Sequence, residues 1–259
     1  MSNVFVIHGV DHKVGTTMIT QSIAEIISRA LPDKKVLLLF LNGRRSTEFI
    51  GEKTGSMENL KLRIDNMMID GSEINSFCLI KGNLFILAGI SKMEEERLYF
   101  PENAIYLLKE ISKQFDLIIV DSGNDLDNGL AIGALKYTEN RILILTQQET
   151  ALRRYEELAT TYVTLGFAFQ RFIINKYYLD DPYDNKYIMS RIGVEKEAIS
   201  FISQHNNYRQ AEVSYKSLLE FKDENYSKDI INVSNHMLEK IGLDKIQNTR
   251  RNRKWINFI

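Results

Sequence analysis

Cysteine and proline are scarce in this chain, and a long apolar run is missing. Cys78 is the single cysteine among 259 residues, which excludes a disulfide framework and a cysteine-rich metal site. We therefore expect a reducing, cytoplasmic environment. No apolar stretch approaches the roughly 18 residues of a membrane-spanning helix, and the N-terminus lacks the pattern of a secretion signal. Peripheral attachment to the inner face of the membrane stays open.

A strong charge of either sign is also lacking. The 33 Lys and Arg residues nearly balance the 34 Asp and Glu residues, giving a net charge of −1. This balance makes nucleic acid an unlikely partner, although it does not exclude a local basic patch. No Pro/Gly/Ser-rich linker divides the chain, and 44% of its residues are apolar, enough for a sizeable core. We predict one domain over residues 1–244, followed by a basic and aromatic tail over 245–259.

Short β-rich apolar runs alternate with helical periodicity. This alternation is typical of a three-layer α/β domain, with a mostly parallel sheet and helices on both faces. The expected strands are 4–7, 36–41, 84–88, 117–121, 141–146, 172–174 and 199–202. The expected helices are one directly after Thr17 that ends near Pro32, then 73–79, 102–113, 129–137, 150–165, 210–221 and 228–241. A polar loop is expected from 175 to 187.

The first strand leads into a loop with the layout of a phosphate-binding loop. It reads Gly9-Val10-Asp11-His12-Lys13-Val14-Gly15-Thr16-Thr17 and opens directly into an amphipathic helix. Such loops hold phosphate with backbone N–H groups and the positive end of the helix. Thr16 stands where the lysine of these loops is expected, so binding and hydrolysis can be uncoupled here. By itself, Val-Gly-Thr-Thr is more typical of an ordinary tight turn.

Polar residues at the ends of several expected strands belong at one rim of the sheet. Ligands of open parallel sheets bind outside the carboxyl ends of the strands, where Gly15, Asp121, Thr146–Gln147 and Asn175 should meet. Thr17 takes the Ser/Thr place that binds magnesium, and Asp121 would hold the same ion through water. Hydrogen bonding at a strand end is the alternative role for Asp121.

Two longer segments carry a family resemblance. Residues 115–123, Phe-Asp-Leu-Ile-Ile-Val-Asp-Ser-Gly, and 142–149, Ile-Leu-Ile-Leu-Thr-Gln-Gln-Glu, together with the first loop, resemble the MinD/ParA group of deviant Walker ATPases. Within this group the chain is most similar to the CpaE/TadZ branch, which places tight-adherence (Flp) pilus machinery in the cell. The similarity in order and spacing runs from about residue 2 to residue 221. It implies a single-domain P-loop NTPase of the SIMIBI type, ATP and Mg²⁺ as ligands, a homodimer, and a protein partner.

The resemblance also implies roles for individual residues. Val14, Gly15, Thr16 and Thr17 would wrap the phosphates, with Lys13 as a shifted cation, and Thr17 and Asp121 would serve magnesium. Asn175 would contact adenine, where the group commonly has an Asn-Arg pair, and the loop from His205 to Tyr208 would cover the base. An ordinary turn role for Asn175 is equally compatible with the sequence.

Departures from the family pattern concern hydrolysis. The family loop reads Lys-Gly-Gly-Val-Gly-Lys-Thr, whereas this chain has Asp11 at the signature lysine and Thr16 at the catalytic lysine. Where the family's second strand ends in Asp-x-Asp, this chain has Phe40-Leu41-Asn42, and phenylalanine can neither orient magnesium nor position water. We expect weak or absent hydrolysis and assign no catalytic residue.

The C-terminal tail is a second functional candidate. Residues 245–259 hold five basic side chains, no acidic one, and Trp255, Ile256, Phe258 and Ile259. This composition suits an anionic membrane surface, although a tail packed on its own domain explains it as well. Three functions remain: an ATP-binding positioning protein of the CpaE/TadZ kind, an active partitioning or division-site ATPase, and an interaction scaffold without nucleotide.

Overall fold

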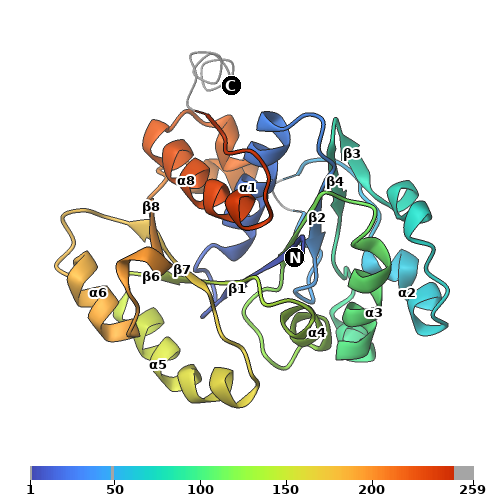
Figure 1. Ribbon diagram of the computed structural model, residues 1–259, viewed down its shortest axis with the longest axis horizontal. Helices are drawn as coiled ribbons and strands as arrows, with labels where there is room; N and C mark the ends of the chain where they lie inside the picture. Colours follow the sequence, from blue (N-terminus) through green and yellow to red (C-terminus); the bar gives the residue numbers. More distant parts are fainter. Residues whose placement is uncertain (1, 48–49, 248–259) are drawn as a thin grey trace.

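Eight strands form one sheet in the computed structural model, which describes residues 2–47 and 50–247 (Figure 1). The strands are β1 (Val4–Gly9), β2 (Val36–Phe40), β3 (Leu79–Lys81), β4 (Leu84–Leu87), β5 (Leu117–Asp121), β6 (Arg141–Thr146), β7 (Arg171–Tyr177) and β8 (Ile199–Ser203). Their order across the sheet is β3-β4-β2-β5-β1-β6-β7-β8, and every pair is parallel except β3 with β4.

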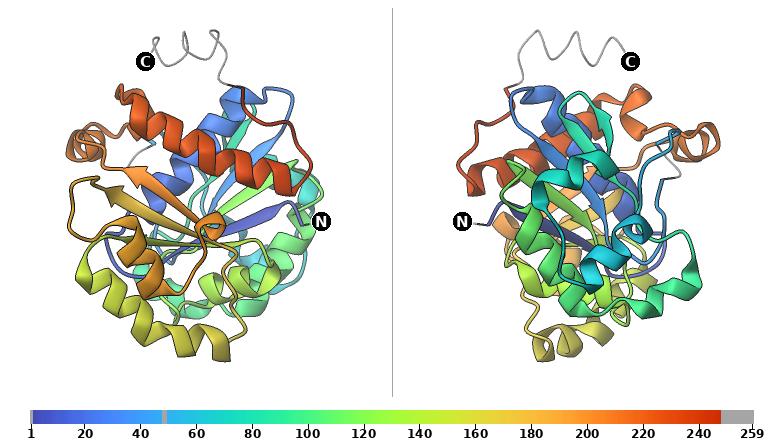
Figure 2. Two further views of the ribbon diagram at one scale, coloured as in Figure 1. Left: turned by 60° about the vertical axis from the view of Figure 1, so that its left-hand side comes forward. Right: turned by 90° about the vertical axis from the view of Figure 1, so that its right-hand side faces the viewer.

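Helices cover both faces of this sheet. They are α1 (Thr16–Ala30), α2 (Met57–Asp65), α3 (Pro101–Ile111), α4 (Gly129–Tyr137), α5 (Glu149–Thr164), α6 (Asn185–Ile192), α7 (Tyr208–Ser214) and α8 (Glu224–Lys240). Figures 1 and 2 show α1 and α8 side by side on one face, with α3, α4 and α5 on the other. The predicted three-layer α/β fold with a mostly parallel sheet is confirmed.

Burial explains why these segments fold in this way. All five residues of β2 are buried, because helices exclude water from both faces of the central strands. In α1, Ile19, Ile23 and Ile27 follow the helical period and are buried against the sheet. The central strands and α1 therefore form a rigid support for the loop between them.

The strand register brings the predicted rim together. Ile7 of β1 lies opposite Asp121 of β5, and Thr146 of β6 lies opposite Asn175 of β7. The carboxyl ends of these four neighbouring strands meet where β1 enters the loop before α1. The predicted convergence of Gly15, Asp121, Thr146 and Asn175 at one rim is thus confirmed.

Two predicted helices are wrong in type or length. Residues 71–77 form a 3₁₀ helix (Gly71–Phe77) that starts at the Asp70 cap, and Leu79 already belongs to β3. The helix predicted over 210–221 ends in its first half, because Tyr215 takes a left-handed conformation with φ of 54°. A separate 3₁₀ turn, Leu218–Glu220, follows the capping residue Ser217.

Two helices were not predicted, α2 and α6. The first turn of α2 is capped by Ser56 and Asn59, and α6 begins at Asp184, whose carboxylate accepts from the N–H of Tyr187. The predicted polar loop over 175–187 therefore holds the end of β7 and the start of α6. Both helices are short, so their apolar periodicity is too brief to stand out in the sequence.

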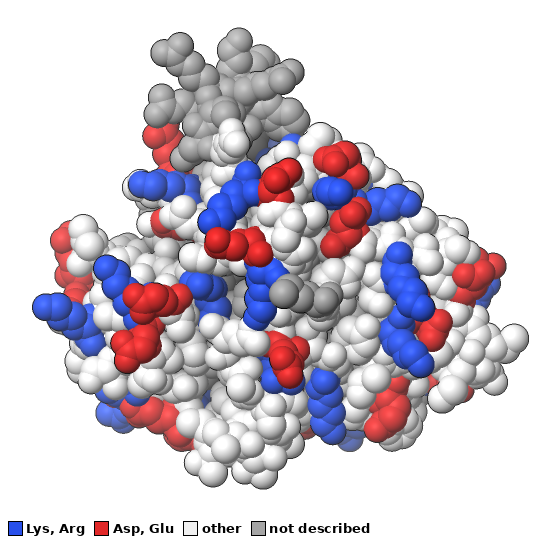
Figure 3. All heavy atoms as spheres, viewed as in Figure 1, with Lys and Arg blue, Asp and Glu red and all other residues white. Residues whose placement is uncertain are grey.

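The outer surface carries charges of both signs. Basic and acidic side chains alternate over the face shown in Figure 3. In the described part of the chain no helix has the length and hydrophobicity to cross a membrane. Of the predicted tail, Ile246 is buried and its N–H donates to Asn235 of α8, while residues 248–259 lie outside the described ranges.

Candidate functional site

The loop between β1 and α1 presents free backbone donors. Gly15 caps α1 with a left-handed φ of 94°, and no side chain accepts a hydrogen bond at this helix end. Among the described residues, the N–H groups from Lys13 to Thr17 donate to no other part of the protein. Because the first turn also lacks an acidic residue, an anion can take these donors together with the positive helix end.

The start of the loop, in contrast, is anchored to the sheet. The N–H of Gly9 donates to the carbonyl of Gly123 over 2.7 Å, and the N–H of Val10 donates to that of Ile144 over 2.9 Å. The side chains of Val14 and Thr16 lie against Gly9, where any Cβ atom would collide with both. Thr16 is 8% exposed, so the residue in the lysine position is packed inside the loop.

Asp121 and Thr17 meet beside the loop, as predicted. Asp121 is fully buried, and its Oδ2 accepts from Thr17 Oγ1 over 2.6 Å, while its Oδ1 accepts from the N–H of Gly123 over 2.8 Å. A carboxylate next to a hydroxyl offers the hard oxygen ligands that Mg²⁺ prefers. The described residues hold no cluster of three or more His, Cys, Asp or Glu side chains for a metal. Magnesium here would therefore depend on ligand oxygens as well.

Asn42 contacts the site, although in the sequence it stands out only as a departure from the Asp-x-Asp pattern. Its Nδ2 donates to Asp121 Oδ2 over 3.0 Å and to Ser46 Oγ over 2.7 Å. An aspartate in this position would face a second carboxylate instead. Phe40 lies opposite Asp121 in the sheet and is fully buried, so it belongs to the core.

Asn175 and Lys176 contact the loop from β7, which is separated from β1 by β6. Asn175 Nδ2 donates to the carbonyl of Val14 over 2.8 Å, and Lys176 Nζ donates to the carbonyl of Lys13 over 2.6 Å. The side chain of Lys13 itself is exposed. Lys176 was not predicted as a site residue. Its position after Asn175 nevertheless matches the Asn-Arg pair of the MinD/ParA group that the sequence resembles. The predicted adenine contact of Asn175 stays a prediction.

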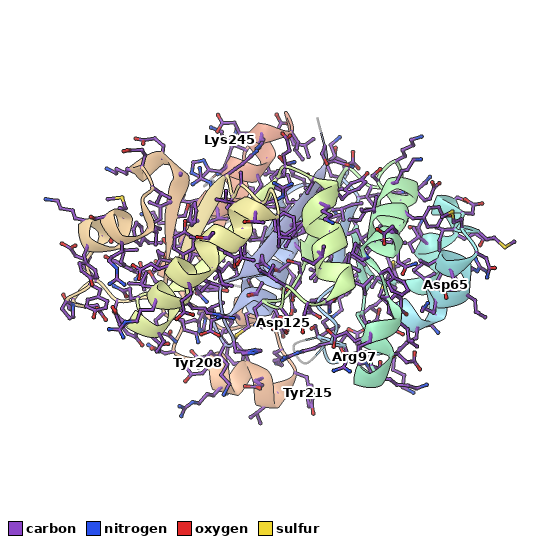
Figure 4. The ribbon with its side chains drawn as sticks, turned by 90° about the horizontal axis from the view of Figure 1, so that it is seen from below. Asp65, Arg97, Asp125, Tyr208, Tyr215 and Lys245 are labelled. Atoms are coloured by element: carbon purple, nitrogen blue, oxygen red, sulfur yellow. The ribbon has the colours of Figure 1, made fainter. Side chains whose placement is uncertain are left out.

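A cavity of about 320 Å³ opens beyond Asn175. It is lined by Thr146, Gln147, Gln148, Lys176, Tyr178, Asp181, Gln204 and Tyr208. Tyr208 and Tyr215 lie along the same rim as Asp125 and Arg97, while Lys245 lies at the opposite side (Figure 4). Burial lowers the pKa of Lys176, and the nearby Lys13 lowers it further.

His205, predicted to cover a base, is buried beside this cavity. Its Nδ1 accepts from the N–H of Asn207 over 3.1 Å, and its ring packs edge-on against Tyr226 at 5.0 Å. These contacts hold the turn that starts α7. Of the two loop residues named from the sequence, Tyr208 lines the cavity and His205 supports the loop below it.

On the other side of the loop, Asp11 lines a second cavity of about 500 Å³. Its walls include His12, Arg154 and the residues 124–127 that follow β5. Behind the loop, His8 is fully buried, and its Nδ1 lies 3.1 Å from Ser122 Oγ. Burial lowers the pKa of His8 to about 4, so this imidazole is neutral at pH 7.

No family model matches the sequence, and no curated protein matches it either. Solved structures, however, share its fold. A ParA family ATPase from Chlorobium tepidum TLS superposes with a TM-score of 0.78 and 19% identity, over 91% of this chain and 100% of that one. A chain of the MinC:MinD cell division protein complex from Aquifex aeolicus gives 0.71 and 15%, over 91% and 96%.

A third structure carries a ligand. The septum site-determining protein MinD from Pyrococcus horikoshii OT3, complexed with Mg-ADP, gives a TM-score of 0.69 and 15% identity, over 90% of this chain and 96% of that one. The chain thus has the α/β fold of the ParA- and MinD-type P-loop ATPases. At these identities the likeness concerns the fold.

Proposed function

We propose that this chain binds ATP with Mg²⁺ at the loop from Lys13 to Thr17. The observation that carries the proposal is the row of free N–H groups in this loop next to the hydrogen-bonded pair Thr17 and Asp121. The phosphates would accept from the N–H groups, and Thr17 and Asp121 would hold Mg²⁺ beside them. The Mg-ADP complex of the Pyrococcus horikoshii protein supports this choice of ligand.

Hydrolysis is weak or absent in this proposal. Thr16 supplies no cation, Phe40 is buried, and Asn42 places an amide on Asp121. Removing one preorganised donor to developing charge costs about 3–4 kcal/mol, which is about a hundred- to a thousandfold in rate. Phe40 and Asn42 stand where the MinD/ParA group has its two aspartates, and neither supplies a carboxylate. The nucleotide therefore acts mainly through being bound.

The base lies in the cavity lined by Thr146, Lys176 and Tyr208. Tyr208 would cover the adenine, and His205 fixes the turn that carries Tyr208. Asn175 holds the carbonyl of Val14 through its side-chain amide, and we assign to it the contact with adenine. These contacts give a defined orientation to a ligand whose phosphates are held mostly by backbone.

The cellular role we propose is that of a nucleotide-dependent positioning protein. ATP binding favours a homodimer that recruits a protein of the machinery to be placed, with the pilus machinery of the CpaE/TadZ branch as the first candidate. The MinC:MinD complex supports a protein partner for this fold. The tail from 245 to 259 adds a peripheral membrane contact. An active partitioning or division-site ATPase and a nucleotide-free scaffold are the alternatives.

Binding and turnover separate these three functions. Mg-ATP at a hundred times its dissociation constant should stabilise the protein by about 2.7 kcal/mol in a denaturation experiment. Phosphate release should be near background and should change little in Asp121→Ala. Robust release that Asp121→Ala abolishes would identify an active ATPase, and an unchanged midpoint with Mg-ATP would identify a scaffold.

A further inference from the structure

We propose that Asn175 and Lys176 form a brace that holds the loop open for an anion, and that Lys176 supplies the cation that Thr16 cannot supply. The first part concerns the protein without ligand. The second part rests on the proposed nucleotide function, because it takes a nucleoside polyphosphate as the anion. The brace consists of two donors from β7 on two consecutive carbonyls of the loop.

Peptide geometry links these carbonyls to the free donors. In a trans peptide the C=O of one residue and the N–H of the next point in opposite directions. Holding the carbonyl of Lys13 fixes the N–H of Val14, and holding the carbonyl of Val14 fixes the N–H of Gly15. Both carbonyls are taken by the brace, so these two N–H groups face away from β7 and remain available.

The backbone adopts uncommon conformations on both sides of the brace. Lys13 has a φ of 60° and Lys176 a φ of 55°, a left-handed region that residues other than glycine seldom take. The pairing of β7 with β8 shifts register between Ile174 and Tyr177, around Lys176. Irregularities of this kind redirect side chains next to functional sites. Here the irregularity accompanies the side chain that reaches the loop.

The charge of Lys176 is available to a ligand. Its ammonium group has three donors, of which one is used on the carbonyl of Lys13. The charged or titratable groups that act on it most are Tyr208 and Lys13. No carboxylate of the described residues lies within ion-pair distance of it. Lys176 also lines the cavity of about 320 Å³, between the loop and the proposed base position. A polyphosphate on the loop would lie within the field of this cation.

The brace is tested in the protein without nucleotide. Backbone order parameters from ¹⁵N relaxation for residues 13–17 should be near 0.85 in the wild type and below about 0.6 in the double variant Asn175→Leu/Lys176→Met. Lys186→Met is the control, since Lys186 is an exposed lysine of α6. Equal order parameters in all three proteins would overturn the brace.

The cation role is tested by titration with Mg-ADP and with Mg-pyrophosphate. Lys176→Met should weaken the affinity for both ligands at least tenfold, and Lys176→Arg less than threefold. Lys186→Met should leave both affinities unchanged. Equal affinity of Lys176→Met and wild type would overturn the cation role. A wild type that binds neither ligand would overturn the proposed function and this role together, while the order parameters still decide the brace.

Discussion

Thr17 Oγ1 and Asp121 Oδ2 lie 2.6 Å apart, although 104 positions separate the two residues in sequence. This hydrogen bond joins the first turn of α1 to the end of β5. It closes one side of the loop, and the contacts of Asn175 and Lys176 close the other. The loop is therefore held from β5 on one side and from β7 on the other, and changes on either side should alter it in different ways.

Asp121→Asn should remove the magnesium dependence of nucleotide binding. The amide keeps the shape of the carboxylate but lacks its charge, so it holds a divalent cation much more weakly. We expect Mg²⁺ to lower the dissociation constant of ADP at least about tenfold in the wild type and less than about twofold in the variant. Calorimetry with and without EDTA measures both constants. Asp125→Asn, in the segment that follows β5, should behave like wild type. Magnesium dependence that survives in Asp121→Asn would reject this ion site.

Gly15→Ala should destabilise the protein more than Gly82→Ala. Both glycines have a positive φ, 94° and 63°, which costs an alanine about 1–2 kcal/mol. A Cβ at Gly82 meets nothing within 4 Å, whereas at Gly15 it collides with the amide of Asn175. Moving Asn175 also breaks its hydrogen bond to Val14, so we expect about 2–3 kcal/mol in total from urea denaturation. Equal losses of stability at the two positions would show that backbone strain alone, without the contact to Asn175, accounts for the effect.

His8 should make the stability depend on pH. Its pKa is lowered from 6.5 to about 4 in the folded protein. Between these two pH values the unfolded chain binds a proton at His8, whereas the folded protein does not. Above pH 6.5 the imidazole is neutral in both states, and His8 does not lower the free energy of unfolding. As the pH falls towards 4, only the unfolded state becomes protonated, so the free energy of unfolding decreases. His8→Leu should therefore gain about 3 kcal/mol relative to wild type between pH 7 and pH 4.

Chemical denaturation at a series of pH values measures this change. His12→Gln, at an exposed histidine of the loop, is the control and should follow the wild-type profile. Parallel profiles of His8→Leu and wild type would show that His8 does not titrate differently in the folded and unfolded states.

Asn42→Asp should destabilise the protein without magnesium and less so with it. The new carboxylate would replace a donor that lies 3.0 Å from Asp121 Oδ2, which puts two negative charges side by side. We expect a loss of about 1–3 kcal/mol in EDTA, reduced when Mg²⁺ neutralises the pair. Asn42→Ala removes the hydrogen bonds without adding charge, so its loss should be the same in both conditions. A magnesium-independent loss in Asn42→Asp would argue against an ion at Asp121.

Much of the fold was predictable because the central strands are continuous apolar runs. The strands at 117–121 and 141–146 and the helix at 129–137 were predicted with the bounds that the structure shows. Buried parallel strands and long amphipathic helices leave a strong pattern in a sequence. The elements that were missed, such as α2 and α6, are short and depend on caps at Ser56 and Asp184.

The site was predictable where a polar residue lies near the carboxyl end of an apolar strand, and not where a contact depends on the local backbone conformation. Strand ends placed Asp121 and Asn175 at the rim, and the pattern after the first strand placed Thr17 near Asp121. The contact of Lys176 with Lys13 depends on a left-handed backbone within β7, and that of Asn42 depends on the fold of the residues after β2. Neither conformation leaves a pattern in the residue types.

The position of β1 in the middle of the sheet has a consequence for biosynthesis. The loop is made early, yet its partners are Asp121 in β5 and the two donors in β7, which ends at Tyr177. A nascent chain that has not released β7 from the ribosome holds the loop sequence without the framework that shapes it. Nucleotide capture should thus begin only after translation has passed about two thirds of the chain, and fragments that stop before β7 should not bind.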